Sequence, residues 1–568
     1  MFVRKIKRAN GEVSVVLVEG YRLNGKVKQR TIAYLGTESE LTKDDPDAVA
    51  KLIEKYKSEQ AQKEVFVKLV LNLAERIPEE NTVRNYGYFY LEKMYRELGL
   101  DRLCQTIQGK AEIEYSLDDC LRLLCYMRAL CPGSKKASLD HGLRYFTEDF
   151  DLKLEQVYKA LTVLADNKKR IVSAMHEALC KQYDRKTDIL YYDVTNYFFE
   201  IDEPDDFRKK GCSKEYRPLP IVQMGLFIDS AGLPVDFYLY EGNKPDCTTL
   251  KPSFDEIKER YAASRVIITA DKGLNSGANL GRILSEDNGY IVSQRIRGAK
   301  KALVDEVMEE DGWTDFGGEG FKLKEFVRTI PVVFPDGTKH DHEQKVVCIW
   351  SRKYQCKEQH ERDNLLERVA LLAANPNKFK QSCHSGMKKY VQETLVDRET
   401  GEVAENVSTV TSLDKDRIEA DKALDGYYLI VTSETGLTAS EVIEKYRGLW
   451  RIEQSFRITK SDISARPVFV RTRKHITAHF LTCFITLTML RMLEIRLGRK
   501  HSCRRIIEAL NSGIATELAK GIYSINKRDE ILNELDRGYG QEFTCRYVKQ
   551  ETLQRYRQGL MNSVYTTP

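Results

Sequence analysis

A succession of apolar strands between residues 189 and 294 limits what this chain can fold into more than any other feature. The predicted strands are 189–199, 221–230, 233–242, 266–271 and 290–294, and the predicted helices are 248–262 and 276–287. Three consecutive strands, then helix, strand, helix and strand, predict a mixed layer, because a TIM barrel would alternate the two kinds of element from its start. The expected fold class is therefore α/β with a mixed sheet.

The segments on either side differ in character. Alternating residues around Asn24-Gly25 predict a β-hairpin, and residues 44–76 and 84–183 have helical spacing. The predicted regions are a hairpin with a charged helix (1–83), a helical region (84–186), the first part of the core (187–294), a β-rich insertion subdomain (295–425), the completion of the core (426–498) and a helical C-terminus (499–568).

Composition excludes several classes of protein. The chain has 568 residues, of which 42% are hydrophobic, so it can bury a sizeable core and is not disordered. Its most apolar stretch, Phe480 to Leu490, is shorter than the roughly 18 residues of a membrane span, and the basic N-terminus lacks the apolar segment of a signal peptide. The 13 cysteines include no Cys-x-x-Cys pair, which favours buried free thiols. A soluble, cytoplasmic protein is expected.

Three acidic residues occupy positions that suggest a shared site. Asp193 lies inside the strand 189–199, Asp271 ends the strand 266–271, and Glu453 lies within a helix. A carboxylate in an apolar strand is costly to bury unless it is paired or binds a metal. Two aspartates on adjacent strands and a glutamate from a packed helix would make an oxygen cage suited to Mg²⁺ or Mn²⁺. Each residue taken alone is more often a solvated acid.

The residues around Glu453 strengthen this interpretation. Thr438 and Glu441 form a capping-box pattern, which predicts a helix of about six turns from this point. The helix face of Glu453 also carries Tyr446, Leu449, Trp450, Phe456, Arg457 and Lys460, and Arg447 and Arg451 flank it. Charged residues within an aromatic stripe do not suit a dry core. A carboxylate for metal and cations for phosphate on one face fit phosphodiester chemistry.

Four ordered motifs resemble the insertion-sequence DDE transposases with a Tyr–Arg–Glu–Lys signature, the insertion-sequence-four superfamily. YRGLWRIEQSFRITK resembles the signature itself, YYDVTNYFF the strand of the first aspartate, and VIITADKGL the strand of the second. The stretch GCSKEYRPLPIVQMGLFIDSAGLPV with GNKPD, and the opening hairpin VEGYRLNGKVKQRTIAYLG, are also similar to this family. The resemblance covers most of the chain and is weakest in 295–425.

The resemblance implies a ribonuclease H-like core with an insertion between its fifth strand and the glutamate helix. It implies that Asp193, Asp271 and Glu453 are the catalytic triad, and that Tyr446 and Lys460 are the signature residues that contact phosphates of the DNA ends. One departure is that Leu449 stands where the signature has arginine, four residues before the glutamate. Either Arg447 or Arg451 could supply that charge from a neighbouring position.

The implied activity is that of a DNA transposase, which cuts at the ends of a mobile element and joins them to target DNA. Two divalent cations, Mg²⁺ or Mn²⁺, held by the three carboxylates would activate a water or a DNA 3′-hydroxyl and stabilise the leaving oxygen. The implied partners are double-stranded DNA, as terminal inverted repeats and as target, and a second copy of the chain in a paired-end complex. In a prokaryotic cell the protein would act at the nucleoid, and no membrane partner is expected.

Basic residues supply candidate DNA surfaces. One cluster consists of Arg208, Lys209, Lys210, Lys214 and Arg217, and a second of Arg466, Arg471, Arg473 and Lys474. Together with the signature segment, the residues expected to contact DNA are Tyr446, Arg447, Trp450, Arg451, Arg457, Lys460, Arg471, Arg473, Lys474, Lys209 and Lys210. The alternative for either cluster is a solvated loop. Recognition of the element ends is expected from the N-terminal hairpin and 84–183, where no helix-turn-helix stands out.

Other functions and sites are less favoured. A transposase-derived regulator would bind DNA without catalysis, but the intact triad argues against it. A metal-dependent nuclease would cut without joining, and a strand-transfer assay separates it from a transposase. The pairs His340–His342 and His475–His479 lack a third ligand in their vicinity, which disfavours a zinc site. The glycines of 273–281 form no phosphate loop, so ATP is not implied.

Overall fold

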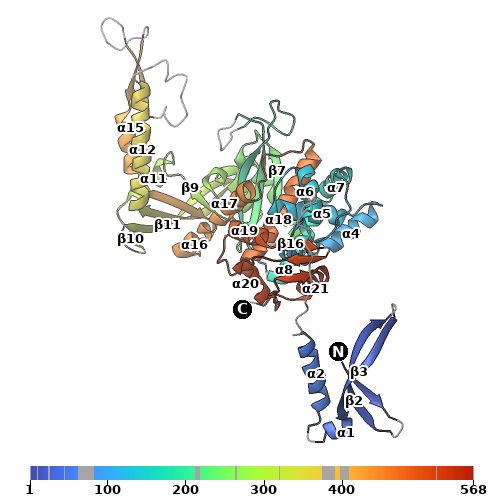
Figure 1. The fold of residues 1–568 in the computed structure, drawn as a ribbon. Coiled ribbons are helices and arrows are strands. Elements are labelled where there is room, and N and C mark those ends of the chain that lie inside the picture. The colour runs from blue at the N-terminus through green and yellow to red at the C-terminus, as the bar shows by residue number, and fades with distance from the viewer. Residues whose placement is uncertain are drawn as a thin grey trace. The chain divides into compact units, whose positions relative to one another are not determined.

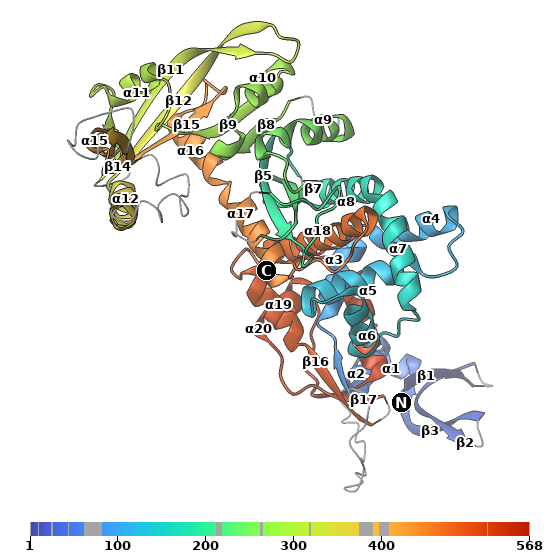
Figure 2. The same ribbon diagram turned by 90° about the horizontal axis from the view of Figure 1, so that it is seen from above.

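The computed structural model describes residues 2–8, 11–23, 26–43, 45–61, 82–183, 185–211, 218–261, 265–316, 318, 320–373, 390–396, 408–519 and 521–566. Contacts divide the chain into two compact units, Met1–Ile77 and Pro78–Pro568. Their ribbons are drawn in Figures 1 and 2.

The N-terminal unit is a three-stranded antiparallel sheet with two helices. Its elements are β1 (Phe2–Lys7), β2 (Val13–Leu23), β3 (Lys26–Thr37), α1 (Glu38–Leu41) and α2 (Ala48–Ala61), and the strand order is β1-β2-β3. The pairing of Leu23 with Lys26 confirms the predicted hairpin, whose Asn24-Gly25 turn lies outside the described residues. Thr37 begins α1 through a capping box with Glu40. Of the helix predicted over 44–76, the part beyond residue 61 lies outside the described residues.

A nine-stranded mixed sheet forms one half of the larger unit. Its strands are β5 (Ile189–Phe198), β6 (Ile221–Asp229), β7 (Pro234–Glu241), β8 (Ile267–Ala270), β9 (Gly289–Gln294), β10 (Thr314–Asp315), β11 (Phe321–Val333), β12 (Lys339–Ser351) and β15 (Tyr427–Thr432). The order is β10-β11-β12-β15-β9-β8-β5-β6-β7. Strands β5, β8 and β9 are parallel, and the other neighbours pair antiparallel. With α9 (Leu250–Tyr261) and α10 (Gly277–Ser285) as connections, the predicted mixed α/β layer is confirmed.

Residues 295–425 extend this sheet. Within the segment predicted as a β-rich insertion, β11 and β12 pair over thirteen register positions from Phe321–Ser351 to Val333–Lys339. Strand β12 then pairs with β15, so the insertion continues the core sheet through that strand. Its other described elements are α11 (Lys301–Met308), α12 (Arg352–Ala373), β13 (Val391–Val396), β14 (Ser408–Leu413) and α15 (Lys415–Ala423).

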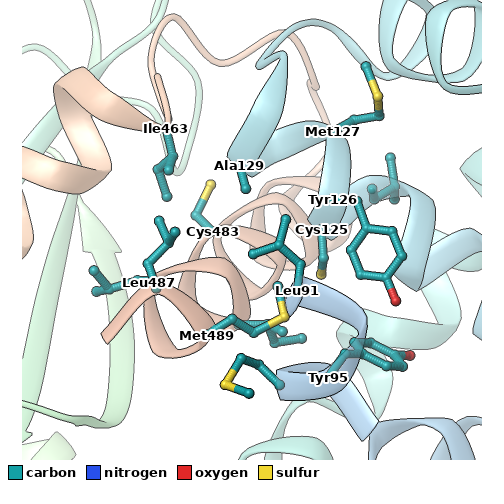
Figure 3. Close-up of a cluster of buried hydrophobic side chains, with 14 of the residues drawn as sticks. Leu91, Tyr95, Cys125, Tyr126, Met127, Ala129, Ile463, Cys483, Leu487 and Met489 are labelled. Atoms are coloured by element: carbon teal, nitrogen blue, oxygen red, sulfur yellow. The ribbon is translucent and has the colours of Figure 1, made fainter. Parts of the chain in front are cut away.

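The other half of this unit is helical. It contains α3 (Tyr88–Glu97), α4 (Leu100–Lys110), α5 (Leu117–Leu130), α6 (Lys135–Tyr145), α7 (Leu154–Asp166), α8 (Lys168–Tyr183), α18 (Arg473–Arg496), α19 (Cys503–Ser512), α20 (Glu530–Gly538) and α21 (Gln550–Asn562). The regions 84–186 and 499–568 share one hydrophobic core around α18. Figure 3 shows part of this core, to which Leu91 and Tyr95 of α3, Cys125 of α5, and Cys483 and Leu487 of α18 contribute side chains.

A small sheet ties these two regions together. Strand β4 (Val83–Asn85) pairs with β16 (Ile514–Ala519), which is followed by β17 (Ile522–Ser524) and β18 (Tyr547–Lys549). The prediction that the C-terminus (499–568) is helical is therefore wrong for β16 and β17. Gly513 ends α19, and its carbonyl accepts a hydrogen bond from the backbone amide of Tyr86. This bond directs the residues after Gly513 into strand β16 beside β4.

Helix α18 is the most apolar long element of the described chain. By length and composition it is the one described helix that could cross a membrane, and 94% of its apolar window is buried inside the protein. The expectation that no apolar segment approaches the length of a membrane span is therefore corrected. Burial at the centre of the helical half explains the composition, because a helix that is apolar all round needs partners on every side.

Candidate active site

The two strand aspartates lie side by side. Parallel strands β5 and β8 are in register through Tyr192 and Ala270, so Asp193 and Asp271 occupy the next pair of positions. Neighbouring strands lie about 4.8 Å apart. Along β8, Asp271 follows the alternation of Ile267 and Thr269, and its backbone is still extended. Both carboxylates thus leave the sheet at the same level.

Alternation also fixes the face from which they emerge. Tyr191, two residues before Asp193, belongs to the same core cluster as Leu449 and Ile452. Ile267 packs against this cluster and against the one that contains Ile443. The carboxylates therefore lie on the sheet face that is covered by α16 (Ala439–Arg447) and α17 (Trp450–Arg457) (Figure 2).

A serine completes the row of polar side chains. Strands β8 and β9 are in register through Ala270 and Val292, which places Ser293 beside Asp271. Its Oγ donates a hydrogen bond to Oδ1 of Asp271 over 3.1 Å. On the other side, Oδ1 of Asp193 accepts a 2.7 Å hydrogen bond from the Val194 amide. Sequence reasoning missed Ser293, although a polar residue in the apolar strand 290–294 is a signal that could have found it.

The helix that carries Glu453 is interrupted. It begins at Thr438 with the predicted capping box, but α16 ends at Arg447, and α17 starts at Trp450. The expectation of one helix of six turns is therefore wrong. Tyr191 explains the break, because its hydroxyl donates to the Lys445 carbonyl over 2.9 Å and fills the space that a Cβ on Gly448 would need. After α17 the chain widens into a π-helical turn, Ile458–Asp462.

All three predicted acids line one cavity of about 420 Å³. The other lining residues are Ile349, Tyr428, Ile430, Ile443, Tyr446, Arg447, Leu449, Trp450 and Ile452. Asp193 and Asp271 come from the sheet wall and Glu453 from the helix wall. Among the residues that the structure describes, no three His, Cys, Asp or Glu side chains converge closely enough to hold a metal ion. The structure thus brings the acids to one cavity without forming a complete ligand cluster.

Two tyrosines stand behind Asp271 in this cavity. The rings of Tyr428 and Tyr446 lie 5.9 Å apart. Burial raises the pKa of Tyr446, and the negative charges of Asp271 and Glu453 raise it further. Hydrogen bonds from Ser293 and Tyr428 partly offset this increase. Burial likewise raises the pKa of Tyr428. Both hydroxyls therefore stay neutral near the carboxylates and can donate hydrogen bonds.

The two candidate arginines have different surroundings. Arg447 lines the carboxylate cavity, whereas Arg451 does not. Arg451 donates from Nη1 to the Ser230 carbonyl over 3.0 Å and lines a second cavity of about 490 Å³, which Arg447 and Trp450 also border. Leu449, at the position of the signature arginine, is buried. Trp450 is 52% exposed, and Arg457 is exposed outside both cavities.

A buried arginine that sequence reasoning missed holds α17 from behind. Arg491 of α18 is only 3% exposed. Its guanidinium donates to Gln454 Oε1 over 2.9 Å, to Ser455 Oγ over 2.9 Å and to the Arg451 carbonyl over 3.1 Å. Glu494 balances its charge over 2.6 Å. These bonds grip the residues on both sides of Glu453.

The two predicted basic clusters and the signature residue Lys460 meet at the end of β5. Each of four cations lies over an aromatic ring of residues 197–207, namely Lys460 over Tyr197, Arg466 over Phe198, Arg208 over Phe199 and Arg473 over Phe207, at 4.8 to 5.5 Å from the ring centre. The strand that carries Asp193 leads directly to this surface. Lys214 and Arg217 lie outside the described residues.

The other predicted cations of these clusters divide into two kinds. Lys209 pairs with Glu241 and Lys474 with Asp166, each over 2.8 Å, so part of their charge is balanced. Lys210 and Arg471 are exposed.

The histidine pair considered for a zinc site has other contacts. His475 lies 3.2 Å from the Thr162 hydroxyl, and buried His479 contacts the Ala465 carbonyl over 2.9 Å. Neither histidine belongs to a metal cluster among the described residues.

Comparison with known proteins gives two family matches. The family model described as "Transposase DDE domain" matches residues 198–489. That range includes Asp271 and Glu453 and begins five residues after Asp193. The family model described as "IS1634 family transposase, N-terminal domain" matches residues 3–64.

A cryo-EM structure of the piggyBac transposase synaptic complex with hairpin DNA is similar over 84% of this chain and 78% of that chain, with 10% sequence identity and a TM-score of 0.29. No curated protein matches the chain.

Proposed function

The chain belongs to the transposases with a DDE domain and is a DNA transposase, an enzyme of DNA cleavage and strand transfer; on this premise we propose that Asp193, Asp271 and Glu453 are its catalytic carboxylates. The observation that carries this proposal is the cavity that all three line. The adjacent register of Asp193 and Asp271 supports it further, since it leaves both carboxylates on one face at the end of parallel strands.

The donor chemistry fits the divalent metal ions that DDE transposases use. Carboxylate oxygens are the ligands that Mg²⁺ and Mn²⁺ prefer, and Asp193, Asp271 and Glu453 would hold them. When bound, such ions activate the attacking oxygen and stabilise the leaving oxygen. We assign Mg²⁺, with Mn²⁺ as a substitute, because every side chain proposed as a ligand is a carboxylate.

The remaining cavity residues would position the DNA strand. Arg447 supplies the charge of the missing signature arginine, since it lines the carboxylate cavity while Arg451 is engaged with the Ser230 carbonyl. Tyr446, whose pKa is raised further above its ordinary value by burial, keeps its hydroxyl proton and would donate a hydrogen bond to a phosphate oxygen. Exposed Trp450 would contact the DNA end at the mouth of the cavity.

The surface at the end of β5 would then receive the DNA backbone. Lys460 and Arg473, together with Arg208 and Arg466, rest on aromatic rings, which limits their side-chain freedom and aligns their charges. Exposed Lys210, Arg457 and Arg471 would add phosphate contacts, with Lys209 and Lys474 at the margin. Each contact neutralises one phosphate and releases counterions.

The sheet topology supports a ribonuclease H-like core. Strands β7, β6 and β5 form an antiparallel meander, and β8 and β9 continue it in parallel. We assign the core to 187–294 and 426–498, with 295–425 inserted after its fifth strand. The other assigned regions are 1–83, 84–186 and 499–568. Because coordinated excision needs both ends of the element, we expect two copies of the chain to pair them.

Substitution of each carboxylate tests the proposal. Asp193→Asn, Asp271→Asn and Glu453→Gln should each abolish Mg²⁺-dependent cleavage of a plasmid that carries the element ends, and leave end binding in EDTA unchanged. Exposed Glu444 of α16, which lines only the second cavity, provides the control Glu444→Gln. Pre-cut ends with supercoiled target then test joining. Normal cleavage by any of the three variants would remove that residue from the site.

A further inference from the structure

The N-terminal sheet has one covered face. Register places Lys5, Val15 and Gly36 side by side on it. Lys5 pairs with Glu38 of α1 over 2.5 Å, and a Cβ on Gly36 would lie 3.2 Å from the Leu41 side chain of the same helix. Val15 is fully buried. Helices α1 and α2 therefore occupy this side of the sheet (Figure 1).

Side chains of the opposite parity form an open face. Along β1 these are Phe2, Arg4 and Ile6, followed by Arg8, and Tyr34 lies in the same row as Arg4 across Val16. Phe2, Ile6 and Tyr34 are 41%, 40% and 52% exposed, and both arginines are exposed.

Contacts between side chains confirm that these residues share a face. Arg4 donates from Nη1 to Gln29 Oε1 of β3 over 2.9 Å. The guanidinium of Arg8 lies over the Tyr34 ring at 5.2 Å. The open face, defined here by Phe2, Arg4, Ile6, Arg8 and Tyr34, therefore carries two guanidinium groups, each in contact with β3, among exposed apolar side chains.

Charge is unevenly divided along the sequence of this unit. Residues 1–36 contain eight basic residues, Arg4, Lys5, Lys7, Arg8, Arg22, Lys26, Lys28 and Arg30, against two acidic ones, Glu12 and Glu19. Residues 37–61, the part of the sequence that includes α1 and α2, contain seven acidic residues, Glu38, Glu40, Asp44, Asp45, Asp47, Glu54 and Glu59, against four lysines. Such a polarity would turn the sheet toward a polyanion.

We propose that the open face binds duplex DNA, so that this unit holds the element end while the carboxylate cavity cuts it. Guanidinium groups bind phosphate or guanine through paired donors, and β-ribbons can enter the major groove. Phe2, Ile6 and Tyr34 would contact sugars and thymine methyl groups. A second copy of the unit is a poorer partner, because the two arginine faces would repel each other. The inference rests on the activity on DNA stated above.

The strand itself offers a matched comparison. Arg4 and Arg8 lie on the open face, and Lys5 and Lys7 have the opposite parity on β1. The full chain is prepared as R4Q/R8Q and as K5Q/K7Q, which remove the same charge from the two faces. R4K/R8K keeps the charge but not the guanidinium fork. Binding to a labelled duplex from the element end is measured in EDTA at several salt concentrations, with a shuffled duplex as competitor.

We expect R4Q/R8Q to weaken end binding about tenfold or more and to lower the slope of log affinity against log salt by about two units, one for each phosphate contact. K5Q/K7Q should change affinity by less than about twofold, and R4K/R8K should recover most of the salt slope. Equal losses in the first two variants, or no loss in R4Q/R8Q, would overturn the proposal. So would a change of oligomeric state in R4Q/R8Q with normal DNA binding, because the face would then bind a second copy.

The assay contains no metal ion, so its result does not depend on the catalytic carboxylates. D193N serves as the reference in the same binding assay, and its cleavage is measured separately with Mg²⁺. If D193N retains cleavage, the assignment of that residue to the active site is wrong, and the comparison of the two faces of β1 still stands.

Discussion

Ser293 and Asp271 are joined by a 3.1 Å hydrogen bond from the serine Oγ to the carboxylate Oδ1. The serine belongs to β9, on the side of Asp271 away from Asp193, as the parallel register of β5, β8 and β9 shows. The bond therefore anchors one carboxylate oxygen and fixes the rotation of the Asp271 side chain. A ligand whose orientation is fixed in this way binds a metal ion with less loss of freedom.

Ser293→Ala tests this positioning role. Loss of one hydrogen bond to a charged group costs about 1.5–3 kcal/mol at most, so we expect the concentration of Mg²⁺ needed for half-maximal cleavage to rise by about 10-fold. At saturating Mg²⁺ the rate should approach that of the unaltered chain. Cleavage is measured across a Mg²⁺ titration. Ser293→Thr, which keeps a hydroxyl group, is the control, and an unchanged titration in the alanine variant would contradict the role.

Arg447 and Arg451 can be separated by substitution. Arg447→Ala removes a cation from the carboxylate cavity and should lower cleavage by about 10- to 100-fold, the effect of one lost charged contact of about 1.5–3 kcal/mol. Arg451→Ala instead removes the hydrogen bond to the Ser230 carbonyl and should lower the free energy of unfolding by about 1 kcal/mol. Cleavage rates and thermal unfolding of both variants are compared. The reverse pattern would assign the signature charge to Arg451.

The sequence predicted the core of this fold because its strands are apolar and its helices periodic. The strands β5 to β9, and the connections between them, follow from that pattern, and Asp193 and Asp271 stood out because they break it. The interruption between α16 and α17 could not be predicted from that pattern. It depends on the Tyr191 hydroxyl, which donates a hydrogen bond to the Lys445 carbonyl, 254 residues away in sequence. Arg491 was missed for the same reason, since no local pattern shows that it faces α17. Strand β16 is defined by pairing with β4, near the other end of the chain.

A half-buried histidine predicts how stability depends on pH. Burial, together with the nearby charge of Arg185, lowers the pKa of His176 on α8 to about 4. Between about pH 6.5 and 4, this histidine is protonated in the unfolded chain, where its pKa is near 6.5, but stays neutral in the folded chain. The contribution of His176 to the free energy of unfolding should therefore be fully present above about pH 6.5 and be lost as the pH falls toward 4. The contribution is on the order of 1 kcal/mol, because the ring is partly exposed to solvent.

Thermal unfolding of His176→Asn checks this dependence. The variant should lose less stability than the unaltered chain between about pH 6.5 and 4. Exposed His360, which lies 3.1 Å from the Asn364 amide, provides the control His360→Asn. If the unfolding temperatures of the unaltered chain and the His176 variant fall in parallel with decreasing pH, another group causes the loss of stability in acid.

Arg491 should affect catalysis through the helix that carries Glu453. Arg491→Lys keeps the charge beside Glu494, but a lysine cannot reach Gln454, Ser455 and the Arg451 carbonyl together. We expect cleavage to fall by about 10- to 100-fold, since small misplacements of a catalytic group are costly, and end binding in EDTA to persist. Arg496→Lys on the same helix is the matched control, because Arg496 pairs with Glu97 in the helical half. If both variants lower thermal stability equally and lose cleavage equally, Arg491 has only a structural role. A selective loss in Arg491→Lys, with a raised Mg²⁺ requirement, assigns it to the positioning of Glu453.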